Sequence, residues 1–75
     1  MPFIHLYARS GRDIETKKKT AEALVKAASE VMGAPETAFT VVYEDIDGDA
    51  WEKEIKQTVI EPLRDKILIE GGKPV

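Results

Sequence analysis

The sequence from residue 2 to residue 8 is Pro-Phe-Ile-His-Leu-Tyr-Ala, an apolar and aromatic run that predicts a β-strand over residues 3–8. Neither of its two alternating sets of side chains is strongly polar. We therefore expect both faces of this strand to be at least partly covered.

Pro2 stands directly after Met1 and opens this run. If Met1 is removed, Pro2 becomes a free secondary amine at the edge of a core. Desolvation there disfavours the ammonium form and lowers the pKa of the amine. A general base is most effective when its pKa lies near the working pH, so Pro2 is a candidate general base.

A helix is predicted over residues 14–32, because apolar residues recur there with helical spacing. Asp13 suits the N-cap position, and Gly33 suits the left-handed position that ends a helix. β-Branched and aromatic residues then predict a second strand from about Ala38 to Ile46. Because the helix is long enough for a crossover, we expect the two strands to be parallel, with a right-handed connection.

A second helix is predicted beyond the turn at residues 47–49, since apolar residues recur there every four positions. These are Trp51, Ile55, Val59, Leu63 and Ile67. Asp49 and Glu52 resemble a capping box at its start, and Pro62 predicts a break or kink near Glu61. We expect the tail from Gly71 to Pro74 to be loose.

The composition predicts one domain over residues 1–75 and excludes several kinds of site. The 75 residues include no cysteine and a single histidine, which excludes disulfides and makes a metal site improbable. The formal net charge is −3, which argues against nucleic acid as a partner. Lys17, Lys18 and Lys19 cannot form one patch on a helix and are interpreted as a solvated face. With no leader and no apolar span, we expect a cytoplasmic protein without membrane contact.

A chain of this length buries only about 60% of its unfolded surface and is marginal alone. A sheet of two strands is also rarely stable by itself. Two copies joined along strand edges would form a four-stranded sheet. We therefore expect a homo-oligomer, at least a dimer, with an active site near the subunit boundary.

The ordered features of this chain resemble the 4-oxalocrotonate tautomerase family. They comprise the Met1-Pro2 start, Gly11-Arg12 after the first strand, the helix, Ala34-Pro35, the second strand and Trp51. The resemblance covers nearly the whole chain and implies a β-α-β-α protomer of the α/β class. The tail resembles small dimeric members active on phenylpyruvate-like enols, rather than the hexameric type that ends in a short glycine-containing hairpin.

The resemblance implies a role for four residues. Pro2 matches the proline that moves the proton, and Arg12 matches an arginine that holds a substrate carboxylate. Trp51 matches an aromatic wall of the site, and Thr40 stands where the hexameric enzymes carry a second arginine. This departure favours a monocarboxylated or aromatic 2-oxo acid enol over 4-oxalocrotonate. The implied activity is a keto-enol tautomerase that needs no cofactor, because one amine can take and return the single proton.

Other interpretations of the same residues remain open. Arg12 in a turn is most often solvated, Trp51 is more often a core residue, and His5 is more often a packing or interface residue than a catalyst. A hydratase or dehalogenase would need a group that activates water, which the sequence does not identify. A non-catalytic dimeric module, such as a ribbon-helix-helix DNA binder, is opposed by the second strand and by the acidic charge balance.

Overall fold

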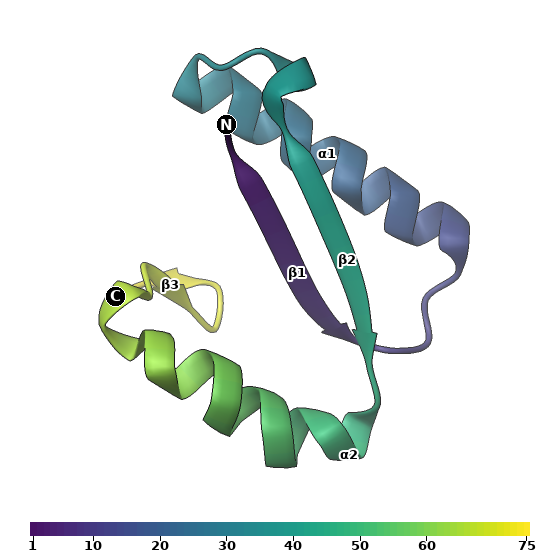
Figure 1. The fold of residues 1–75 in the computed structure, drawn as a ribbon, viewed down its shortest axis with the longest axis vertical. Coiled ribbons are helices and arrows are strands. Elements are labelled where there is room, and N and C mark those ends of the chain that lie inside the picture. Colours follow the sequence, from purple (N-terminus) through teal and green to yellow (C-terminus); the bar gives the residue numbers. More distant parts are fainter.

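Two parallel strands and the helix between them form the central unit of the computed structural model, which describes all 75 residues (Figure 1). Strand β1 (Phe3–Arg9) pairs with strand β2 (Thr40–Ile46) in parallel, with Phe3 opposite Thr40 and Arg9 opposite Ile46. Helix α1 (Ile14–Met32) connects them. The predicted mixed α/β class with a β-α-β unit is confirmed.

Helix α1 begins and ends where the sequence predicts. The Asp13 carboxylate accepts the backbone N–H of Thr16 at 2.8 Å, which satisfies one of the free donors of the first turn. Gly33 adopts a left-handed conformation with φ of 73° and donates its N–H to the Ser29 carbonyl at 3.0 Å.

The second strand begins two residues later than predicted. Ala38 belongs to the short helix η1 (Glu36–Ala38) rather than to β2. The N–H of Phe39 donates to the Glu36 carbonyl at 3.1 Å, so a turn occupies the residues that follow Pro35. Strand propensity alone could not place the start of β2, because the turn before it is held by backbone hydrogen bonds.

The C-terminal helix consists of α2 (Gly48–Ala50), the π-helical η2 (Trp51–Ile60) and the 3₁₀ segment η3 (Glu61–Lys66). The change of winding at Glu61 confirms the predicted break before Pro62. A four-residue repeat drifts by about 40° per step on an α-helix, and the wider π turn reduces this drift. The predicted capping box is wrong, because the Asp47 carboxylate accepts the N–H of Asp49 at 3.1 Å and caps the helix instead.

The tail is not loose, contrary to prediction. Strands β3 (Ile69–Glu70) and β4 (Lys73–Pro74) form an antiparallel hairpin. Gly71 and Gly72 have φ values of 60° and 80°, as a two-residue hairpin turn of type I′ requires. The chain therefore ends in a short glycine-containing hairpin, and its tail no longer supports assignment to the dimeric subgroup.

The two faces of the β1–β2 sheet differ in what covers them. Helix α1 lies behind the sheet in Figure 1, whereas the C-terminal helix lies below the strands and extends beyond the edge of β1. Lys17 of α1 forms an ion pair with Asp45, so this lysine is not part of a purely solvated face as predicted. The face turned away from α1 carries the other alternating residues, which we call the open face. Apart from Arg9 and Ile46, which lie at the end where the C-terminal helix starts, its residues are Phe3, His5, Tyr7, Thr40, Val42 and Glu44.

Very little of the chain is buried. Ile46 and Ile55 are the only two buried residues. The exposed surface is 5871 Å² for 8.3 kDa, whereas a compact monomer of that mass exposes about 4,600 Å². The radius of gyration is 13.6 Å, against about 11 Å for a compact domain of this length. No helix has the length and apolar character needed to cross a membrane.

Candidate active site

Pro2 and Thr40 lie together at the amino-terminal ends of the two strands. The Pro2 carbonyl accepts the N–H of Thr40 at 3.2 Å, which holds Pro2 against β2. Pro2 is half-buried, while Met1 before it is fully exposed. Thr40 is exposed and uncharged. This end of the sheet therefore combines a held proline with an open polar position.

Arg12 and Trp51 lie at the opposite, carboxyl-terminal end of the sheet. Ser10 donates its N–H to the Ile46 carbonyl at 2.9 Å, which joins the loop after β1 to the end of β2. The N–H of Trp51 donates to the Asp47 carbonyl at 2.9 Å and starts the C-terminal helix near that end. Trp51 is half-buried and Arg12 is exposed.

The four predicted site residues thus form two separate pairs within one chain. Strand β1 has seven residues, which at about 3.3 Å per residue separates its ends by roughly 20 Å. The structure brings Pro2 and Thr40 together, but within one chain it does not bring either of them to Arg12 or Trp51. A site that contains all four would need more than one copy of the chain.

Arg12 is better placed than Arg9 to bind an anion. Arg9 Nη2 lies 3.4 Å from Glu52 Oε1, so part of its charge is already compensated. Arg12 forms no ion pair, and its only side-chain hydrogen bond is from Nη1 to the Arg9 carbonyl at 3.2 Å. An arginine has five N–H donors, so the remaining ones can bind a carboxylate through bidentate hydrogen bonds.

One polar cluster was not predicted from the sequence. His5 Nε2 lies 2.7 Å from Glu44 Oε1, and the His5 ring stacks on Tyr7 with ring centres 4.1 Å apart. Alternation along β1 could have placed His5 beside Tyr7. The pairing with Glu44 depends on the register between strands that are 39 residues apart.

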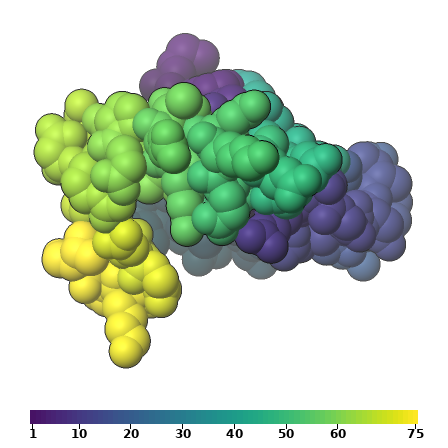
Figure 2. Space-filling view, turned by 90° about the horizontal axis from the view of Figure 1, so that it is seen from below, coloured from purple at the N-terminus to yellow at the C-terminus, as the bar shows by residue number.

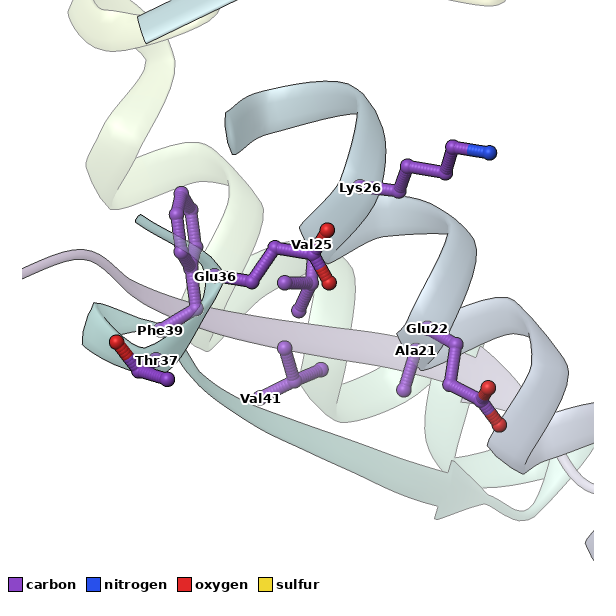
Figure 3. A pocket seen from close by; sticks show the side chains of 8 residues that line it. All are labelled: Ala21, Glu22, Val25, Lys26, Glu36, Thr37, Phe39 and Val41. Carbon is purple, nitrogen blue, oxygen red and sulfur yellow. The ribbon is translucent and has the colours of Figure 1, made fainter. Parts of the chain in front are cut away.

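The largest cavity, about 510 Å³, lies between α1 and the segment that enters β2 (Figure 3). Ala21, Val25 and Val41 form its apolar floor, and the charged side chains of Glu22 and Lys26 extend outward from it. None of the four predicted site residues lines this cavity. It is an open junction between helix and sheet.

Comparison with known protein families gives one match. The family model described as "Tautomerase enzyme" matches residues 2–53, which is more than half of the chain and includes all four predicted site residues. None of the curated proteins compared with the chain is significantly similar to it. The matched region begins at Pro2 and ends just after Trp51.

Proposed function

The chain belongs to the tautomerase family, and on that premise we propose that it is a cofactor-independent keto-enol tautomerase. The substrate class is the enol of a 2-oxo acid with one carboxylate, such as phenylpyruvate. Ketonisation moves one proton from the enol oxygen to a carbon. A single amine can carry this proton, and the free Pro2 nitrogen is that amine.

The observation that carries this proposal is the position of Pro2. It is the first residue of the family match and the residue that leads into β1, where Thr40 holds its carbonyl. The Thr40 side chain beside it adds no cation. One carboxylate-binding arginine is then available for each site, which supports a substrate with one carboxylate.

Two copies joined along their β1 edges would complete the site. Antiparallel pairing would bring Pro2 of one copy beside Arg12 and Trp51 of the partner subunit. Pairing along β2 instead would leave three strand spacings between them, about 14 Å. Strand β2 also carries Glu44 and Asp45, and charged residues oppose pairing at a sheet edge, whereas β1 has no charged residue before Arg9.

In this site, Arg12 of the partner subunit would orient the substrate carboxylate, and its positive charge would favour the unprotonated Pro2 amine. Trp51 of the partner subunit would exclude water and so strengthen both interactions. The proton then moves between the substrate oxygen, the Pro2 nitrogen and the substrate carbon.

The decisive experiment follows the absorbance of the phenylpyruvate enol as it converts to the ketone. The wild-type protein is expected to accelerate this conversion, and a chain acetylated on the Pro2 nitrogen is expected to lose the acceleration. If no enolisable 2-oxo acid is converted faster than in buffer, the proposal is wrong and a non-catalytic binding role takes its place.

Mixing two impaired chains, assayed at a substrate concentration well below KM, tests whether the site is shared between copies. One chain carries an acetylated Pro2 nitrogen and the other carries Arg12→Ala. In a mixed dimer one site regains both functional groups, so about a quarter of wild-type activity is expected after random exchange in a two-fold dimer. If the site lies within one chain, mixing restores nothing.

A further inference from the structure

We propose that the C-terminal arm, Trp51–Val75, packs its apolar side against the open face of the sheet in a second copy of the chain. This inference rests on the pairing of two copies along β1 that the proposed function includes. It adds the contact that would cover the sheet face left bare by the protomer.

The open face lacks a cover over most of its length. Phe3 is 62% exposed and Val42 is 37% exposed, although both lie within the sheet. Phe3, His5 and Tyr7 form a row of rings along β1, with Phe3 edge-on to His5 and His5 stacked on Tyr7. Aromatic and apolar side chains arranged in this way offer a large surface for packing.

The arm carries a complementary apolar groove. This groove has a volume of about 350 Å³ and lies between η3 and the hairpin. Its apolar lining consists of Val59, Ile60, Leu63, Ile67 and Ile69. Leu63 is 47% exposed and Ile69 is 64% exposed, so the chain itself leaves this side of the arm uncovered.

The arm leaves its own sheet in the direction where the sheet of a second copy would lie. Ile46 lies on the side of the sheet away from α1 and is buried where the C-terminal helix starts. From there the arm runs past the edge of β1 instead of back across its own sheet (Figure 1). In the view from below, its helix fills the near face and its hairpin projects from one corner (Figure 2).

That region beyond β1 is where the second sheet would lie in a β1-paired dimer. A two-fold axis perpendicular to the sheet keeps both open faces on the same side. The arm of each copy starts on that side, so it would cross the open face of the partner. The contact would then occur twice, once for each arm.

The surface area favours a second copy as the occupant. The exposed surface exceeds that of a compact monomer by about 1,300 Å², and a standard interface buries about 800 Å² on each partner. Charge does not oppose the contact, because Arg64 on the arm already pairs with Glu61 at 2.6 Å and with Glu70 at 2.8 Å. Those two carboxylates raise the pKa of Arg64, which compensates one of their two negative charges, and residues 51–75 as a whole carry five acidic and five basic side chains.

The first test compares Leu63→Asp/Ile69→Asp with the control Val31→Asp by light scattering over a range of concentrations. Val31 is 89% exposed on α1, away from the arm and the open face. The double variant is expected to weaken self-association by roughly 100-fold or more, because each dimer would bury four introduced carboxylates. The control is expected to associate like wild type. Equal association of all three proteins would overturn the proposal.

A cross-linking experiment keeps the proposal testable if the double variant fails to fold. A photoreactive benzophenone replaces the side chain of Ile69 in a ¹⁵N-labelled chain, which is refolded together with unlabelled wild type. We expect cross-linked peptides that join the labelled tail to unlabelled residues 3–7 or 40–44. Cross-links confined to one chain would overturn the arm contact while leaving the proposed function intact. Monomeric protein without links between chains would contradict both the arm contact and the shared active site.

Discussion

Pro2 and Arg12 lie beyond opposite ends of β1, with the full length of a seven-residue strand between them. A proton carrier and a carboxylate-binding group must both contact one small substrate. The separation therefore decides how the proposed reaction is organised, because the two groups can meet only across a boundary between copies.

Active protein is expected to lack Met1. Met1 is fully exposed and Pro2 after it is small, so the terminal residue is accessible for removal. An acylated Pro2 nitrogen is an amide and cannot act as a base. Intact mass spectrometry of the active fraction checks this. Full activity in protein that retains Met1 would contradict the role of Pro2.

Replacement of Arg12 by alanine is expected to raise KM more than it lowers kcat, if the contact is equally strong with substrate and transition state. A charge-assisted hydrogen bond contributes about 1.5 to 3 kcal/mol, so kcat/KM should fall by about 10- to 150-fold. Steady-state kinetics with a 2-oxo acid enol measures both constants.

Arg9→Ala is the matched control for that variant. Arg9 lies at the same end of β1 but is already paired with Glu52 at 3.4 Å, and both side chains are more than half exposed. We expect Arg9→Ala to change kcat/KM by less than about threefold, as is usual for exposed ion pairs. If Arg9→Ala causes the larger loss, the carboxylate-binding role belongs to Arg9.

The pH dependence of kcat/KM is expected to report the Pro2 amine. Activity should rise with pH through a single free-enzyme pKa, as the free base replaces the ammonium form. The midpoint should lie below the ordinary range of an α-amine, about 7.7 to 8.0. Pro2→Ala retains a terminal amine after removal of Met1, so it should reduce activity without abolishing it. A pH-independent profile would contradict proton transfer by this group.

The N-cap of α1 makes a stability contribution that depends on pH. The hydrogen bonds from Thr16 lower the pKa of Asp13 below its ordinary value of 3.8. A lowered pKa in the folded state stabilises the protein above the unfolded pKa, and this stabilisation is lost as pH falls through the folded pKa. Asp13→Ala should therefore lower Tm at pH 7, and the difference from wild type should shrink below pH 4.

The variant Asp13→Asn distinguishes the stability contribution of the N-cap hydrogen bond from that of the Asp13 charge. Asparagine still accepts the N–H of Thr16 but does not titrate in this range. Its Tm should lie near that of wild type at pH 7, and its stability should not change with pH through this position. Thermal unfolding followed by circular dichroism measures both variants. Identical pH profiles for Asp13→Asn and wild type would show that the Asp13 charge contributes nothing.

The four candidate site residues could be chosen from the sequence, but their relative placement could not. Pro2 is recognisable because it precedes an apolar strand, whereas the roles of Arg12, Thr40 and Trp51 are implied only by the resemblance to the tautomerase family. Whether they meet depends on the length of β1 and on how a second copy is placed. No pattern in the sequence of one chain encodes the distance between Pro2 of one copy and Arg12 of another.

Local interactions explain the elements that could be predicted from the sequence alone. These are the strand after Pro2, the limits of α1 at Asp13 and Gly33, and the break near Pro62. Each depends on backbone preferences and on bonds within about five residues. Contacts between distant parts of the chain set the pairing of His5 with Glu44, the packing of α1 on one face of the sheet, the path of the C-terminal helix beyond the edge of β1, and the bare surface of the other face. These features join residues distant along the chain, and their geometry follows from strand register and from the direction in which each helix leaves the sheet.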